Sequence, residues 1–118
     1  MATFLLWNVH RHQLDGHIVR LAQRHKVDVL LLIEQPKPDN TLLSQLNNVD
    51  TFHRVPSHDR FSVYVNFDVA RMERILPPFE NDRVDFWNIT LSRRNKVLLV
   101  LVHGLDIVNN PCASILEN

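Results

Sequence analysis

Glycine and cysteine are almost absent from this chain, and each scarcity excludes a class of protein. The two glycines, Gly16 and Gly104, cannot build the glycine-rich loops of P-loop or dinucleotide-binding proteins. The single cysteine, Cys112, excludes an internal disulfide and suits a reducing compartment. The beginning of the sequence shows no export signal either. We therefore expect a cytoplasmic protein.

The chain also lacks a net charge and a long hydrophobic run. Thirteen basic residues balance 13 acidic ones, so no overall field attracts nucleic acid or a membrane surface, although a local basic patch stays possible. Its apolar runs are far shorter than the roughly 20 residues of a membrane span. The 118 residues are 45% hydrophobic and 22% charged, which is typical of a globular chain. We expect one domain over residues 1–118, or part of one.

An unbroken aliphatic run from Val29 to Ile33 ends on Glu34. Such a run cannot alternate between water and a core, so it predicts a strand that is buried on both faces. An earlier strand begins at Thr3 and ends its apolar part at Asn8, and the amphipathic segment 13–25 between the two predicts a helix. In a β-α-β unit the two strands are parallel. Asn8 and Glu34 should therefore meet at one edge of the sheet.

The remaining chain predicts a second helix and several strands. Asp39, Asn40 and Thr41 are helix-capping residues before the apolar positions of that helix. Period-two and aliphatic patterns then predict strands at 51–55, 61–66, 83–91 and 97–102, with a turn at 92–95 and His103 following the last strand. Residues 69–76 fit either strand or helix, and the pattern leaves the tail from 109 to 118 open.

This order of elements resembles the endonuclease/exonuclease/phosphatase superfamily. In that family the first strand ends in an Asn, the second in a Glu that holds a catalytic Mg²⁺, and a later strand in a His that contacts the scissile phosphate. Asn8, Glu34 and His103 match these positions. The resemblance implies an α+β fold: a mixed β-sheet with helices on one face, one half of the deoxyribonuclease I-like four-layer α/β sandwich. It also implies Glu34 and Asn8 as ligands of Mg²⁺ or Mn²⁺, and His103 and Asn8 as catalytic residues.

The chain departs from the family pattern after His103. The family completes its site with an Asp-x-Asn motif and a terminal Asp-His pair, and Asp106 is followed by Ile107 and Val108 instead. We therefore expect an incomplete N-terminal portion of a Mg²⁺-dependent phosphoester hydrolase, inactive alone, with a phosphate ester and possibly nucleic acid as substrate. With one sheet and helices on one side only, its other face would need a second copy or a missing C-terminal half as cover.

Two alternatives stay open at this point. The same half-fold could be a non-catalytic module for dimerisation or regulation. The histidine-rich segment with His10, His12, Asp15 and His17 could instead hold the metals of a di-metal hydrolase, although its spacing departs from the known signature. If the chain is instead part of a Mg²⁺-dependent hydrolase of the superfamily, His10 would only support a metal ligand.

Other residues allow a binding reading as well as a structural one. Arg60, Arg93 and Arg94 could contact phosphate, and solvated turns are the simpler interpretation. Trp7 and Trp87 are interpreted as core residues.

Overall fold

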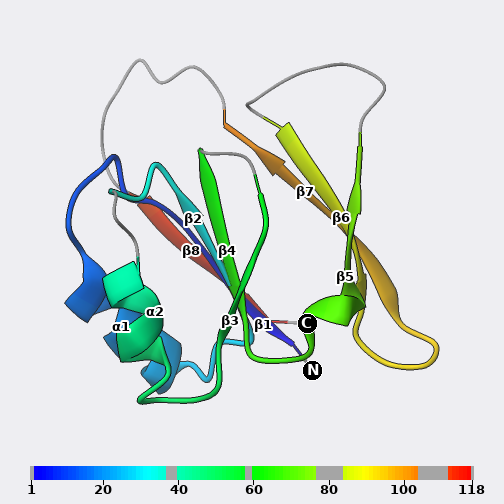
Figure 1. Ribbon diagram of the computed structural model, residues 1–118, viewed down its shortest axis with the longest axis horizontal. Coiled ribbons are helices and arrows are strands. Elements are labelled where there is room, and N and C mark those ends of the chain that lie inside the picture. The colour runs from blue at the N-terminus through cyan, green and yellow to red at the C-terminus, as the bar shows by residue number, and fades with distance from the viewer. Residues whose placement is uncertain (1, 37–39, 58–59, 77–83, 104–111, 118) are drawn as a thin grey trace.

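The computed structural model describes residues 2–36, 40–57, 60–76, 84–103 and 112–117. Among them a five-stranded sheet has the order β3-β4-β2-β1-β8, and a three-stranded sheet has the order β5-β6-β7. Helices α1 and α2, the large sheet and the small sheet form three successive layers (Figure 1). The helices lie on one face of the large sheet, as expected, and the fold is mixed α and β as the sequence predicted.

The bounds of the elements follow the predicted order closely. They are β1 (Thr3–Asn8), α1 (Asp15–Arg24), β2 (Val29–Ile33), α2 (Asn40–Leu46), β3 (His53–Val55), β4 (Phe61–Val65), a short 3₁₀ turn η1 (Val69–Arg71), β5 (Met72–Ile75), β6 (Val84–Thr90), β7 (Lys96–Val102) and β8 (Cys112–Glu117). The ambiguous segment 69–76 is a 3₁₀ turn followed by a strand. Part of the open tail forms β8, which pairs antiparallel with β1.

Strand β2 lies at the centre of the large sheet and is buried along its whole length. Its alternate side chains Leu30 and Leu32 pack in one cluster with Ile18 and Ala22 of α1 and with Leu42 and Leu46 of α2. Successive strand residues point to opposite faces. Val29, Leu31 and Ile33 accordingly belong to a second cluster on the other face. The unbroken aliphatic run therefore serves two cores.

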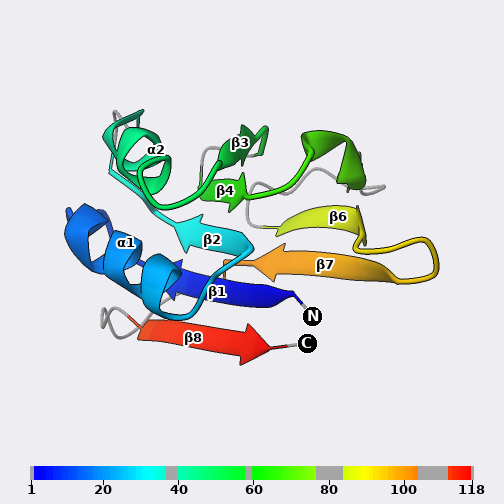
Figure 2. The ribbon, with the colours of Figure 1, turned by 90° about the horizontal axis from the view of Figure 1, so that it is seen from below.

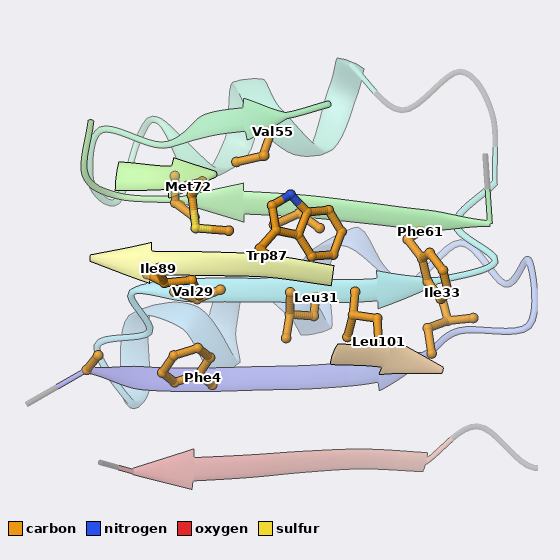
Figure 3. Close-up of a cluster of buried hydrophobic side chains, with 13 residues drawn as sticks. Phe4, Val29, Leu31, Ile33, Val55, Phe61, Met72, Trp87, Ile89 and Leu101 are labelled. Atoms are coloured by element: carbon orange, nitrogen blue, oxygen red, sulfur yellow. The ribbon is translucent and has the colours of Figure 1, made fainter. Parts of the chain in front are cut away.

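The small sheet covers the face of the large sheet that lies away from the helices. Trp87, Ile89 and Leu101 from the small sheet join the cluster of Leu31 and Ile33, and Figure 3 shows their side chains filling the space between the two sheets. The expectation of a single sheet with an uncovered face was wrong. Residues of β6 alternate between buried and half-buried positions. That alternation is typical of a strand with one face on a core, and β5, β6 and β7 form a layer of their own.

The exposed apolar surface lies on the outer face of the small sheet instead. Leu98, Val100 and Val102 of β7 are 59%, 41% and 61% exposed. They alternate with inward residues such as Leu101, which is 3% exposed. No helix in the described parts of the chain is long and apolar enough to cross a membrane.

Trp87 should be the side chain on which the packing of the two sheets depends most. It is fully buried between them. We expect Trp87→Ala to lower the free energy of unfolding by about 3–5 kcal/mol, because it removes a large buried ring and leaves a cavity. Leu98→Ala, at an exposed position of β7, should lower it by less than about 1 kcal/mol. Urea unfolding measures both values, and similar losses in the two variants would contradict this packing.

Candidate functional site

The C-terminal ends of β1 and β2 form one edge of the large sheet. The strands are parallel, and Asn8 lies opposite Ile33 in the register. Neighbouring strands are about 4.8 Å apart. Asn8 and Glu34, which directly follows Ile33, are therefore neighbours at this edge, and the predicted β-α-β arrangement is confirmed.

Glu34 has an unusual backbone conformation. Its φ angle is 56°, in the left-handed region that residues other than glycine rarely adopt. Its N–H donates to the carbonyl of Arg60 at 2.9 Å, and its own carbonyl accepts the N–H of Arg11 at 2.7 Å. Hydrogen bonds to segments on both sides thus hold the residue in this conformation. Strained backbone of this kind gathers at functional sites.

The chain after β1 makes a tight turn beside Glu34. The N–H of His12 donates to the carbonyl of Val9 at 2.8 Å, and the two central residues, His10 and Arg11, have φ angles of 48° and 62°. Positive φ at both central positions is the mark of a type I′ turn. The side-chain oxygen of Asn8 accepts the N–H of His10 at 3.0 Å, which stabilises the entry to the turn. Asn8 therefore shapes the loop that presents His10.

Two imidazoles contact the carboxylate of Glu34, one from each sheet. Nε2 of His103, the residue after β7, lies 3.3 Å from Oε1, and Nδ1 of His10 lies 3.7 Å from Oε2. The side chain of His103 is 5% exposed, that of His10 is 11% exposed and that of Glu34 is 24% exposed. Each contact is an ion pair when its imidazole is protonated. Of the residues predicted for the site, Asn8, His10, Glu34 and His103 all lie at this edge.

The carboxylate of Glu34 is the group here that fits a hard divalent cation. Mg²⁺ needs only one or two carboxylates and keeps several of its waters, and Glu34 reaches solvent at the end of its strand. The oxygen of Asn8 is already used within the turn, so its direct role as a ligand has less support than that of Glu34. The described residues contain no group of three or more His, Cys, Asp and Glu side chains placed to hold a metal ion.

The histidine-rich segment gives no support to the di-metal hypothesis. Asp15 is buried at the start of α1, whereas His12 and His17 are exposed. Burial raises the pKa of the Asp15 carboxyl, and a hydrogen bond from Gln13 opposes that rise. Among the residues that the structure describes, the side chains of His12, Asp15 and His17 are not part of any group of three or more that could hold a metal ion.

Two further residues near the edge were not singled out by the sequence. The hydroxyl of Tyr64 donates to Oε1 of Gln35 at 2.9 Å, and both side chains are buried. This bond fixes the chain directly after Glu34 to β4. A polar residue after a buried strand was the available signal for Gln35, but nothing in the spacing indicated Tyr64.

The arginines considered for phosphate contacts are separated by the fold. Arg60 lies at the Glu34 edge through its carbonyl. Arg93 and Arg94 lie in the turn between β6 and β7, at the end of β7 opposite to His103 (Figure 1). Trp87 is fully buried and Trp7 is half-buried against the helical core, so the interpretation of both as core residues is confirmed.

Comparison with solved structures identifies the fold. The chain is similar to an endonuclease/exonuclease/phosphatase family protein from Leptotrichia buccalis C-1013-b, with 11% sequence identity and a TM-score of 0.55 over 87% of this chain. It spans 53% of that protein's length. No protein-family model matches the sequence, and no curated protein matches it. The likeness shows that the chain has part of the fold of the endonuclease/exonuclease/phosphatase superfamily.

Substitutions of Glu34 by glycine and alanine test its left-handed backbone conformation. We expect Glu34→Gly to be more stable than Glu34→Ala by about 1 kcal/mol, because glycine adopts positive φ without a steric penalty. Glu73 in the middle of β5 is the matched control, since it is exposed and extended. There the order should reverse, because glycine weakens a strand. Urea unfolding of the four variants decides, and the same order at both positions would refute the left-handed conformation of Glu34.

Proposed function

We propose that the Glu34 edge is the site of a Mg²⁺-dependent phosphoester hydrolase, a nuclease or phosphatase, of which this chain supplies the N-terminal portion. The observation that carries the proposal is the contact between Glu34 and His103. These two residues come from different sheets, and the packing of the sheets brings them to 3.3 Å. The superfamily fold supports the same reading.

Glu34 is the proposed metal ligand. Its carboxylate would bind Mg²⁺ or Mn²⁺, and Asn8 would stabilise the neighbouring loop through its hydrogen bond with the N–H of His10. When bound, the metal neutralises negative charge on the phosphate oxygens and so favours attack by water. Glu34 would also orient His103 through their 3.3 Å contact.

His103 is the proposed contact to the reacting phosphate. A protonated imidazole donates a short, charge-assisted hydrogen bond to a phosphate oxygen, or a proton to the leaving oxygen. His103 is almost fully buried, so its ring is held in place by its surroundings. His10 lies on the other side of the carboxylate and would support the orientation of Glu34.

The base that activates water is the part of the site that this chain is not expected to supply. The sequence after His103 lacks the Asp-x-Asn and Asp-His motifs of the family. Because the chain spans about half of its structural neighbour, we propose that a longer form carries these groups. The 118-residue chain alone should therefore hydrolyse phosphate esters very slowly.

A non-catalytic module is the second candidate function. The observation that favours it is the exposed apolar outer face of β7, with Leu98, Val100 and Val102. A surface of this kind is more typical of an interface than of free solvent. In this reading the half-fold works by association, through a second copy or a missing half, and needs no metal.

Metal-dependent hydrolysis separates the two candidates. We expect the longest natural form to cleave bis(p-nitrophenyl) phosphate or p-nitrophenyl phosphate with Mg²⁺ and to stop in excess EDTA. Glu34→Gln should lower the rate at least about 100-fold, because it removes the charge that holds the ion. His103→Gln should lower it by about 10²–10⁴-fold, the range of a proton donor.

Matched variants keep this test specific. Glu73→Gln and His53→Gln change an exposed carboxylate and an exposed imidazole on other strands, and both should keep the rate within about twofold. Equal activity of Glu34→Gln and Glu73→Gln would exclude the proposed metal site. A well-folded longest form without any Mg²⁺-dependent cleavage would favour the module.

A further inference from the structure

A cleft of about 600 Å³ opens at the end of the sheets opposite to Glu34. Ala2, which precedes β1, and Asp28, which precedes β2, lie at its base. Its other lining residues come from two places: Asn66, Phe67 and Arg71 before β5, and Leu91, Ser92 and residues 94–97 around the turn between β6 and β7, a turn that Figure 1 shows. The cleft therefore lies between the two sheets and is separate from the site already described.

Positive charge dominates this cleft. Arg71, Arg94 and Lys96 line it, and Asp28 is the acidic residue among its lining side chains. None of the three cations forms an ion pair with another residue that the structure describes. The carboxylate of Asp28 accepts the N–H of Thr3 at 2.8 Å and the side-chain amide of Asn66 at 2.9 Å. The formal charges of the lining thus leave an excess of two positive charges.

Two of the cations are carried by ordered structure. The guanidinium of Arg71 lies 5.9 Å from the centre of the Phe67 ring, a cation–π distance. Arg94 lies in a turn that three backbone hydrogen bonds among Leu91, Ser92 and Asn95 close. The contact with Phe67 restricts the side chain of Arg71, so less of its freedom is lost on binding.

We propose that this cleft binds a phosphate monoester dianion. Guanidinium groups match phosphate oxygens with paired N–H donors, and a lysine ammonium adds a point charge. Ser92 and Asn95 also line the cleft, and residues of these types carry neutral donors. The charge of a dianion equals the positive excess of the lining. A monoanionic phosphodiester leaves half of that excess unmatched, so the cleft selects the monoester.

The proposal is independent of hydrolysis at Glu34. Arg94 precedes β7 and Lys96 is its first residue, whereas His103 follows the strand, so the two sites lie at opposite ends of β7. The titration that tests it uses EDTA throughout, which prevents a divalent ion from carrying phosphate to Glu34.

The test is a ¹H–¹⁵N NMR titration of the chain with phenyl phosphate at pH 8, where a monoester is a dianion. Dimethyl phosphate at matched ionic strength is the monoanion control. We expect phenyl phosphate to shift amide signals of residues 66–71 and 91–97 in a saturable way. Dimethyl phosphate should bind at least about tenfold more weakly, since one of two charges is missing.

Adjacent arginines give the matched pair of variants. Arg94 lines the cleft, and Arg93 in the same turn does not. Arg94→Ala and Lys96→Ala should each raise the Kd about tenfold, and Arg93→Ala should change it less than twofold. Both arginines are exposed, and well-dispersed spectra will show that each variant is folded.

Three outcomes would overturn the proposal. The first is an equal Kd for Arg93→Ala and Arg94→Ala, and the second is equal binding of dimethyl phosphate and phenyl phosphate. The third is a set of shifted signals around Glu34 and His103 with none in the cleft.

Discussion

The contact of the small sheet with β2 is the interaction on which the rest of the structure depends. Leu31 and Ile33 point away from the helices and pack with Trp87 and Leu101, side chains of β6 and β7. Figure 2 shows the small sheet lying along the large one, so that β7 ends near the carboxyl ends of β1 and β2. Burial of this apolar surface is worth about 25 cal/mol for each Å² removed from water. The same packing determines where His103 lies.

Packing between layers explains why distant residues share one site. Glu34 follows a central strand of one sheet, and His103 follows the last strand of the other. The two side chains meet because the two sheets pack against each other. Backbone hydrogen bonds to Arg11 and Arg60 then fix the conformation of Glu34 that directs its carboxylate toward both imidazoles. The site is thus positioned by the core and adjusted by the loops.

The sequence predicted the half of the fold that rests on strong periodicity. The aliphatic run of β2 and the helical spacing before it determine a β-α-β unit, and that unit alone brings Asn8 and Glu34 together. The second layer was missed because a hydrophobic pattern tells which faces are buried but not which element covers them. The pairing of β8 with β1 was equally hidden, since a short strand at a sheet edge has little signal of its own.

The candidate site was also predicted only in part from the sequence. The positions of Asn8, Glu34 and His103 at strand ends were readable from the sequence, but their contacts were not. The left-handed backbone of His10, Arg11 and Glu34 involves no glycine and no asparagine, so the residue types did not predict it. Local hydrogen bonds close the turn at His10 and Arg11, whereas the bonds of Glu34 to Arg11 and Arg60 are long-range and exist only once the sheet has formed.

The two ends of the molecule also differ in charge. One end gathers a carboxylate and two imidazoles, which suits a cation, and the other gathers two arginines and a lysine around a cleft, which suits an anion. The overall balance of 13 basic and 13 acidic residues hides this polarity. Charge placed by the fold, and not net charge, therefore indicates what each end can bind.

A double-mutant cycle on Glu34 and His103 tests the central claim most directly. The free energies of unfolding of Glu34→Gln, His103→Gln and the double variant would be measured by urea titration against the parent chain. Residues in contact are coupled, so the account predicts an interaction energy of about 0.5 kcal/mol or more. Additivity within about 0.3 kcal/mol would show that the two side chains do not meet, and would contradict the account.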